Sequence, residues 1–254
     1  MKAMILAAGL GTRLKPLTDD RPKALVEING RSLLEMALSR LRSFGVNEAI
    51  INVHHMADMI VDYLGKNNNF SMRLEVSRED VVLDTGGGLK KAAHFFEEGS
   101  GDGEEPFILH NVDVLSTIDL GQMLQSHKQT RALATLAVQH RETSRYLLFD
   151  ETMQLCGRRS GLDGQNELVR PLQHMDALAF SGIHILSPRI FDVMSEEGVF
   201  SIITSYLRLA AQGESITGFC ADDYYWRDLG RLADLNQAAK DLTQNTLLQR
   251  AITA

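Results

Sequence analysis

Apolar segments of strand length alternate with amphipathic, helix-patterned segments along this chain, and that alternation restricts the fold more than any other feature of the sequence. In the first helix-patterned segment, Ser32 and Glu35 form a capping box and Gly45 ends the apolar pattern. Strands that alternate with helices form βαβ units, in which helices cover both faces of a mostly parallel sheet. We therefore predict an α/β fold, a Rossmann-like three-layer sandwich around a mostly parallel mixed sheet.

The expected elements follow this pattern to the end of the chain. Helices are expected from Ser32 to Gly45, then at residues 56–64, 88–96 and 201–212, and from residue 231 onward. Residues 158–167 contain Gly161 and Gly164 and are expected to form a loop. Strands are expected at residues 2–7, 48–53, 72–76, 106–110, 132–138, 146–149, 177–186, 216–219 and 224–227.

The first predicted strand runs directly into a glycine-rich segment, GLGTRLKPLTDDRPK, at residues 9–23. Gly9 and Gly11 have no side chains, so the main chain can approach a polyphosphate closely and direct N–H groups at it. Arg13 and Lys23 contribute positive charge: a guanidinium can bind two oxygens, whereas an ammonium acts as a point charge. We interpret this segment as a nucleoside-triphosphate site. The alternative is an ordinary tight turn whose basic residues lie in solvent.

Two better-known glycine-rich loops do not fit this segment. A Walker A loop ends in Gly-Lys-Ser/Thr, whereas Gly11 is followed by Thr12 and Arg13, and Lys23 comes too late to lie at the start of a helix. The dinucleotide-binding fingerprint needs a third glycine where this chain has Leu14.

The composition excludes several partner classes and sets the scale of the domain. A net charge of -7 and a pI near 5.6 argue against a nucleic-acid or anionic-membrane partner, because such partners select basic patches. No apolar run approaches the ~20 residues that span a bilayer, and the apolar start is too short for a signal peptide. Cys156 and Cys220 lack zinc-motif spacing, so we expect passive thiols and a cytoplasmic protein. The 254 residues, 44% of them hydrophobic, are enough for one large core, so a single domain is expected.

Two aspartates follow predicted strands far apart in the sequence. Asp113 comes after the strand at 106–110, and Asp228 comes after the strand at 224–227. In an open α/β sheet, ligands bind beyond the carboxyl ends of the strands. Two carboxylates at separate strand ends can share one Mg²⁺, which prefers one or two protein oxygens together with phosphate oxygens and water. An aspartate at either position can equally be a helix N-cap or a turn residue, so the spacing alone leaves both interpretations open.

Several segments together resemble the sugar-1-phosphate nucleotidyltransferases, also called nucleoside-diphosphate-sugar pyrophosphorylases. The resemblance spans nearly the whole chain, and within the family the short length and the DTGGG segment are most similar to the N-acetylmuramate-1-phosphate uridylyltransferases of bacterial cell-wall recycling. The segments are LAAGLGTRLKPLT at 6–18, RPKAL at 21–25, SREDVVLDTGGGLKKA at 77–92, NVD at 111–113, FSGIHIL at 180–186 and WRDLGRLADL at 226–235.

The resemblance implies the nucleotide-diphospho-sugar transferase fold over residues 1–254. Residues 1–115 form the nucleotide-binding part, residues 116–230 the sugar-phosphate-binding part, and residues 231–249 a closing helix. The implied partners are a nucleoside triphosphate, UTP above all, and a sugar 1-phosphate, with no nucleic acid and no membrane. A monomer or a small homo-oligomer is expected.

The implied reaction is attack by the sugar 1-phosphate on the α-phosphorus of the triphosphate, which gives a nucleotide sugar and pyrophosphate. The nucleophile needs no general base, because a phosphate monoester with a second pKa near ~6 is already an anion at neutral pH. Catalysis is then a matter of position and electrostatics. We assign Arg13 to the leaving pyrophosphate and Lys23 to phosphate oxygens near the reacting centre, while Asp113 and Asp228 match the family's ligands for the catalytic Mg²⁺.

The resemblance also assigns binding residues. The glycine triplet after Thr85 is expected to open a helix and to lie against the base, although bare glycine triplets often form flexible turns. Two departures from the family pattern concern the acceptor: Val112 replaces a usual glycine, and Val169-Arg170-Pro171 replaces Glu-Lys-Pro. The expected nucleotide-binding residues are Leu6, Ala7, Ala8, Gly9, Gly11, Thr12, Arg13, Glu79, Thr85, Gly86 and Gly87, and the expected sugar-phosphate-binding residues are Asn111, Arg170, Gly182 and Lys23.

Two other functions stay open at this stage. The first is a catalytically silent nucleotide-sugar-binding regulatory subunit, which would not need the metal carboxylates Asp113 and Asp228. The second is a cytidylyltransferase that acts on a non-sugar phosphate, for which residues 158–186 are the discriminating region.

Overall fold

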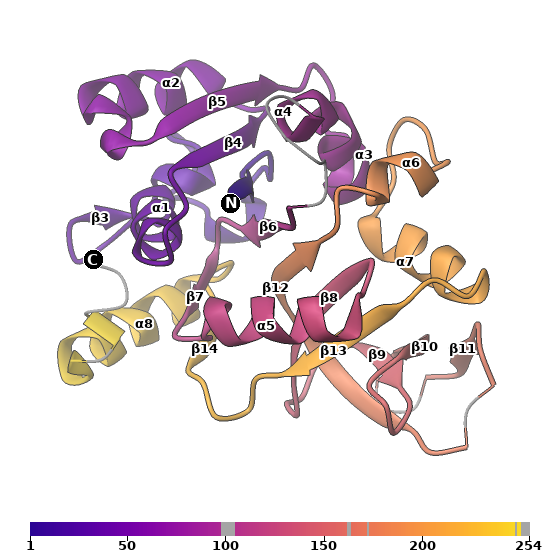
Figure 1. Cartoon of the computed structure of the whole chain (residues 1–254). Helices are drawn as coiled ribbons and strands as arrows, with labels where there is room; N and C mark the ends of the chain where they lie inside the picture. The colour runs from indigo at the N-terminus through magenta and orange to yellow at the C-terminus, as the bar shows by residue number, and fades with distance from the viewer. Residues whose placement is uncertain (98–104, 162–163, 172, 247, 250–254) are drawn as a thin grey trace.

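The computed structural model describes residues 1–97, 105–161, 164–171, 173–246 and 248–249, and it is organised around a ten-stranded sheet (Figure 1). Eight strands follow the order β11-β10-β9-β12-β6-β1-β4-β5, while β8 pairs with β12 and β13 pairs with β8. The strands are β1 (Lys2–Leu6), β4 (Glu48–Val53), β5 (Arg73–Arg78), β6 (Phe107–Asn111), β8 (Ala134–Gln139), β9 (Arg145–Phe149), β10 (Leu155–Ser160), β11 (Asn166–Leu168), β12 (Asp176–Leu186) and β13 (Ile216–Cys220).

The sheet is mixed, with a parallel central part. The strands β5, β4, β1 and β6 are parallel to one another, and β8 is parallel to β13. The long strand β12 is antiparallel to β6, β8 and β9, and it therefore joins the parallel part to the antiparallel edge formed by β9, β10 and β11. Two-stranded ladders pair β2 (Glu27–Ile28) with β3 (Arg31–Ser32), and β7 (Val114–Ser116) with β14 (Trp226–Asp228).

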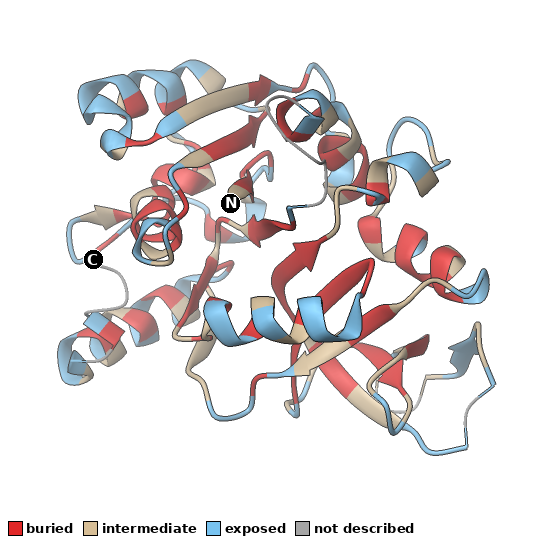
Figure 2. Ribbon diagram, in the orientation of Figure 1, coloured by how far each residue is buried: buried red, intermediate tan, exposed pale blue. Residues whose placement is uncertain are grey.

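Helices cover both faces of the sheet, which confirms the predicted three-layer sandwich. Because side chains alternate along a strand, Ile5 of β1 packs into one hydrophobic cluster and Met4 into the other. The buried strands and the inner helix faces contrast with exposed outer helix faces in Figure 2. The first cluster includes residues of α1 (Leu33–Ser43), α2 (Ala57–Lys66), α5 (Leu120–Thr130) and α8 (Leu232–Gln244), and the second includes residues of α3 (Asp84–Lys91), α4 (Ala93–Glu97), α6 (Ile190–Val193) and α7 (Ile202–Ala211).

Most of these elements lie where the sequence predicts them, and three elements differ clearly from the prediction. Helix α1 begins as predicted, with the Ser32 hydroxyl accepting a hydrogen bond from the Glu35 N–H at 3.0 Å. Helix α5, capped by Asp119, was not predicted. Residues 158–160 belong to strand β10 rather than to a loop, because all three pair with β9 and residues 158–159 also pair with β11; residues 162–163 of the expected loop lie outside the described residues. The glycine triplet lies inside α3 instead of opening a helix.

Strand β1 lies at the point where the sheet order reverses. The chain passes from β1 to β4 on one side, whereas β6 is its neighbour on the other side. In open α/β sheets, ligands bind in the crevice beyond the carboxyl ends of the strands at such a switch point. The loops that follow β1 and β6 are therefore the first place to look for a site. None of the helices among the described residues has the length and apolar character to cross a membrane.

Candidate active site

A cavity of about 210 Å³ opens at the carboxyl ends of β1 and β6, where the switch point predicts a ligand. Eight of the residues that line it were expected at the site from the sequence, and four others were not. The expected ones are Leu6, Ala7, Ala8, Gly9, Lys23, Thr85, Asn111 and Asp113, and the additional ones are Asn52, Val82, Asp84 and Val112.

The glycine-rich loop brings Lys23 to this cavity. Gly11 has a φ of +67°, and a Cβ there would lie 3.0 Å from the Cβ of Lys23 and 3.0 Å from Cγ2 of Thr18. The Thr18 hydroxyl donates a hydrogen bond to the Gly11 carbonyl at 2.9 Å, which closes the loop on itself. A Cβ at Gly9 would meet no atom within 4 Å. Gly11 therefore shapes the loop, while Gly9 leaves open space beside the main chain for a ligand.

The two aspartates, distant in sequence, are neighbours in the structure. Strand β14 pairs antiparallel with β7, so that Asp228 is opposite Val114, and the Leu229 N–H donates to the Asp113 carbonyl at 2.8 Å. The Lys23 ammonium forms an ion pair with the Asp113 carboxylate, and both side chains are mostly buried, with 12% and 14% of their surfaces exposed. The structure thus brings Lys23, Asp113 and Asp228 together.

Arg13 completes this group through a glycine that was not singled out in the sequence. A Cβ at Gly230 would lie 2.6 Å from Oδ1 of Asp228 and 2.7 Å from Nη2 of Arg13, so these two side chains converge on Gly230. The Gly230 N–H donates to Oδ1 of Asp228 at 2.7 Å. The absence of a side chain at residue 230 is what lets the guanidinium approach the carboxylate. The signal in the sequence was the spacing Asp228-Leu229-Gly230, two residues beyond a candidate ligand.

The carboxylates fit a divalent cation. Burial, and then the like charge of Asp113, raise the pKa of Asp228, while the Gly230 N–H, Lys23 and Arg13 act in the opposite direction. Two carboxylates that repel each other in a half-buried position are relieved by a bound cation, and oxygen ligands suit Mg²⁺. Asp113 and Asp228 are the residues that would hold such an ion.

One consequence is testable as protein stability. In the metal-free protein, we expect Asp228→Asn to raise the midpoint of thermal unfolding by roughly 2–4 °C, the shift that about 1 kcal/mol produces in a domain of this size. Asparagine removes a desolvated charge and still accepts the Gly230 hydrogen bond. The gain is present at about pH 8 and disappears as the pH falls through the raised pKa of Asp228, because the wild-type carboxyl is then protonated and neutral. Differential scanning calorimetry of both proteins with a metal chelator, at about pH 8 and then at successively lower pH, measures the difference. Equal midpoints of the variant and the wild type at about pH 8 would contradict a destabilising charge at Asp228.

A buried polar network, centred on the cavity-lining Asn52, holds the loops in place. Asn52, which is 2% exposed at the end of β4, accepts a hydrogen bond from the Ala7 N–H at 2.8 Å and donates to Oε1 of Glu79 at 2.7 Å. The other oxygen of Glu79 accepts from the Leu83 N–H at 2.9 Å. Glu79 is 5% exposed, with both oxygens engaged, and it lies behind the residues that line the cavity. The network therefore ties the loop after β1 to the segment that leads into α3. Asn52 was missed, although a polar residue at the end of an apolar strand is a recognisable signal.

The glycine triplet packs α3 against the protein itself. A Cβ at Gly86 would lie 2.3 Å from Cε2 of Phe200, one at Gly87 would lie 2.3 Å from the Gly198 carbonyl, and one at Gly88 would lie 2.7 Å from both Asn52 Nδ2 and Glu79 Oε1. The neighbouring Thr85 hydroxyl accepts a hydrogen bond from the Ile202 N–H at 3.0 Å. Among the residues described around the cavity, Thr85 is part of the lining, whereas Gly86 and Gly87 are not. These glycines therefore have a clear packing role, beside any contact with a base.

This packing role predicts a large difference between two alanine variants. We expect Gly86→Ala to lower the free energy of unfolding by about 1–3 kcal/mol, because the new methyl group overlaps Phe200. Gly65→Ala is the matched control: residue 65 lies within helix α2 with nothing within 4 Å of a Cβ, so alanine should stabilise by roughly 0.5–1 kcal/mol. Urea denaturation measures both changes. If Gly86→Ala kept wild-type stability but raised the KM for the nucleotide, the glycine would serve the base rather than the packing.

The predicted acceptor residues divide into two groups. Gly182 has a φ of +73°, and a Cβ there would lie 2.9 Å from Nδ2 of Asn111, so these two residues are in contact at the site. Arg170 is elsewhere: Nε donates to the Ala210 carbonyl and Nη2 to the Glu214 carbonyl, each at 2.5 Å.

Those carbonyls lie near the start of β13, at the opposite end of the sheet from Asn111. This follows because β13 is parallel to β8, and β8 runs in the same direction as β6, both being antiparallel to β12. The guanidinium of Arg170 is thus engaged in main-chain contacts, and the structure does not bring it together with Lys23 and Asp113.

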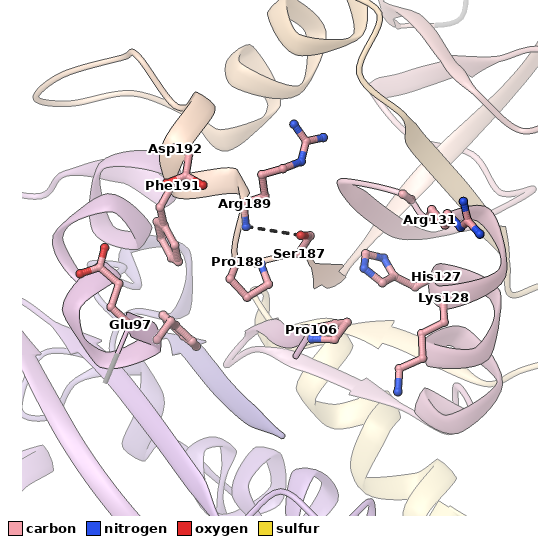
Figure 3. Close-up of a pocket in the computed structure, with 12 residues that line it drawn as sticks. Glu97, Pro106, His127, Lys128, Arg131, Ser187, Pro188, Arg189, Phe191 and Asp192 are labelled. Carbon is pink, nitrogen blue, oxygen red and sulfur yellow. Dashed lines mark hydrogen bonds between the residues drawn. The ribbon is translucent and has the colours of Figure 1, made fainter. Parts of the chain in front are cut away.

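A larger cavity, of about 820 Å³, lies away from these residues. Its lining includes Pro106, just before β6, and Lys128 and Arg131 at the end of α5, so it is at the amino end of β6. Figure 3 shows Glu97 and Asp192 on one side of it and Lys128 and Arg131 on the other, with no pair of carboxylates that faces a common point. This cavity has the larger volume, but Lys23 and Asp113 line the smaller one, which is therefore the candidate active site.

Comparison with known proteins finds relatives over nearly the whole chain. A family model described as nucleotidyl transferase matches residues 2–245. The N-acetylmuramate alpha-1-phosphate uridylyltransferase of Caulobacter vibrioides is 33% identical over 220 residues, which are 83% of this chain and 85% of that protein. The D-glycero-alpha-D-manno-heptose 1-phosphate guanylyltransferase of Aneurinibacillus thermoaerophilus is 27% identical over 95% of this chain and 98% of that protein. A solved structure of UDP-glucose pyrophosphorylase in complex with UDP-glucose shares the fold, with a TM-score of 0.75 at 20% identity over 96% of this chain and 98% of that chain.

Proposed function

Because the chain belongs to the nucleotidyl transferase family and its relatives are sugar-1-phosphate nucleotidyltransferases, we propose that it transfers UMP from UTP to N-acetylmuramate 1-phosphate in a Mg²⁺-dependent reaction. The observation that carries the proposal is the convergence of Arg13, Lys23, Asp113 and Asp228 at the carboxyl ends of β1 and β6. A protein that only binds nucleotides would have no need for two neighbouring carboxylates, because their negative charges repel each other.

The proposed chemistry requires binding, orientation and charge neutralisation. A phosphate oxygen of the acceptor forms a bond with the α-phosphorus of UTP, and the bond from that phosphorus to the bridging α,β oxygen breaks as pyrophosphate leaves. The acceptor phosphate is already an anion near neutral pH, so no proton has to be removed. His110, the residue before Asn111, is not a candidate base, because burial lowers its pKa to about 4 and its Nδ1 lies 2.7 Å from the Asn111 carbonyl oxygen.

Each charged residue has a place in this scheme. Lys23 lines the cavity and would contact phosphate oxygens near the reacting centre, and Arg13 would bind the departing pyrophosphate. Asp113 and Asp228 would hold Mg²⁺, which when bound neutralises charge on the α-phosphoryl group. Asn111 and Gly182, in contact beside these acids, would form the start of the acceptor pocket.

The choice of UTP and of N-acetylmuramate 1-phosphate is supported by the relative at 33% identity, an N-acetylmuramate alpha-1-phosphate uridylyltransferase. A guanylyltransferase is also among the relatives, so the base requires direct measurement. Residues 6–9 and Asn52 line the cavity, where they would meet the nucleotide.

The test is pyrophosphate release from a matrix of four nucleoside triphosphates against N-acetylmuramate 1-phosphate, N-acetylglucosamine 1-phosphate, mannose 1-phosphate and phosphocholine, with and without Mg²⁺. We expect the highest kcat/KM for UTP with N-acetylmuramate 1-phosphate, and none without a divalent ion. Nucleotide binding without turnover of any pair would favour a regulatory subunit. Turnover confined to CTP and phosphocholine would favour transfer to a non-sugar phosphate.

A further inference from the structure

Arg141 lies near Asp228 and belongs to none of the motifs found in the sequence. It follows β8 by two residues, and its guanidinium carbon lies 3.7 Å from the centre of the Trp226 ring, a stacked arrangement. Nη2 donates a hydrogen bond to the Phe180 carbonyl at 2.6 Å, whereas Nε is buried and has no partner among the described residues. A buried guanidinium donor without a partner calls for an explanation, because most such groups are satisfied.

The stacked ring places Arg141 on the acceptor side of Asp228. Trp226 and Asp228 are two residues apart on β14, so their side chains point to the same face of the strand. Burial lowers the pKa of Arg141, and the negative charge of Asp228 opposes that effect, which agrees with the proximity of the two side chains. Arg141 therefore approaches Asp228 from the second half of the chain, whereas Arg13 and Lys23 come from the first 25 residues.

Strand β12 connects Arg141 to the rest of the acceptor pocket. Phe180 accepts the hydrogen bond from Arg141, and Ser181 accepts one from the Trp226 indole N–H at 2.6 Å. The next residue, Gly182, is in contact with Asn111. Three consecutive residues of β12 thus contact Arg141, Trp226 and Asn111, and the guanidinium is held by its stacking on Trp226 and by the Phe180 carbonyl.

The acceptor side of the site needs a cation if the acceptor is a sugar phosphate. The acceptor is a polyanion that enters beside two carboxylates, and Arg170, one of the four residues first assigned to it, donates to main-chain carbonyls near the start of β13 instead. A fixed guanidinium binds a carboxylate or a phosphate through parallel hydrogen bonds. We propose that Arg141 binds an oxyanion of the acceptor, either its phosphate or a carboxylate on the sugar; this rests on the proposed function.

Two oxyanions of N-acetylmuramate 1-phosphate meet this description: the phosphate and the carboxylate of its lactyl group. N-acetylglucosamine 1-phosphate has the same phosphate and lacks the carboxylate. Comparison of the two acceptors therefore identifies the group that Arg141 binds.

The experiment measures KM and kcat for both acceptors and for UTP with the wild type, Arg141→Gln and Arg141→Lys. Arg40→Gln is the matched control, because Arg40 also stacks on a ring, at 4.4 Å from Phe44, donates to one carbonyl at 2.6 Å and has a buried Nε without a described partner. Far-ultraviolet circular dichroism checks that each variant is folded.

We expect Arg141→Gln to raise the KM for the acceptor about 10- to 100-fold, the factor for one charge-assisted hydrogen-bonded pair, with the KM for UTP unchanged. A rise for N-acetylmuramate 1-phosphate alone identifies the carboxylate, and equal rises for both acceptors identify the phosphate. Arg141→Lys should recover part of the loss, and Arg40→Gln should change neither KM.

Unchanged acceptor KM values in a folded Arg141→Gln variant would overturn this inference and leave the proposed function intact. A rise in the KM for UTP as large as that for the acceptor would also overturn it. If the wild type turned over no sugar 1-phosphate, the proposed function would fail first, and this inference with it.

Discussion

Replacement of Asp113 by asparagine is expected to lower kcat for nucleotide-sugar formation by about 10³-fold or more, while the protein stays folded. The carboxylate lies at the carboxyl end of β6, beside Asp228 and in an ion pair with Lys23. Asparagine has nearly the same shape but carries no charge, so it holds a divalent ion poorly and leaves the α-phosphoryl charge without a counterion. A loss of several kcal/mol of transition-state stabilisation corresponds to this factor.

The measurement is single-turnover pyrophosphate release with saturating Mg²⁺. Asp223→Asn is the matched control, because residue 223 is an exposed aspartate on the loop that leads into β14. It should retain wild-type kcat. Activity of Asp113→Asn within tenfold of the wild type would remove Asp113 from the metal site.

Replacement of Lys23 by methionine is expected to lower kcat by about 10²- to 10³-fold, the range seen when one fixed donor to a developing charge is removed. Lys23 lines the cavity and forms an ion pair with Asp113. The lack of a side chain at Gly11 leaves room for Lys23 in this position. Methionine keeps most of the side-chain length and removes the charge. Arg at this position restores the charge but not the compact point-charge geometry, so Lys23→Arg should recover activity only in part.

Lys15→Met is the control for this variant. Lys15 belongs to the same loop, but its side chain is 64% exposed and pairs with Asp19 at the surface. It should behave as the wild type in the same kinetic assay. Equal kcat values for Lys23→Met and Lys15→Met would mean that the ion pair with Asp113 is structural only.

The strand-to-loop junctions at the site could be predicted from the sequence, because local chemistry marks them. A glycine-rich turn after an apolar strand, and an aspartate after another, are short-range patterns, and the structure places Lys23 and Asp113 together as expected. Asp228 joins them because β14 pairs with β7. That pairing is a long-range contact, so the sequence supported it only through the resemblance to a family.

The sequence could not predict which atoms surround individual side chains. The glycines at 86–88 were expected to lie against a base, yet each faces protein atoms, which come from residues 52, 79, 83, 198 and 200. Arg170 matched a motif by its neighbour Pro171, but the fold directs its guanidinium to carbonyls near the start of β13. Arg141 belongs to no sequence motif, and its place near the site follows only from its stacking on Trp226 in the structure.

Crystals grown with Mn²⁺ and UTP give the most direct test of the shared metal site, because the anomalous signal of Mn²⁺ locates the ion independently of the protein model. We predict one ion at about 2.1 Å from an oxygen of Asp113 and from an oxygen of Asp228, close to the distance that Mg²⁺ takes to its oxygen ligands. An ion bound by the phosphates alone, with both carboxylates turned away from it, would contradict the site proposed for this enzyme.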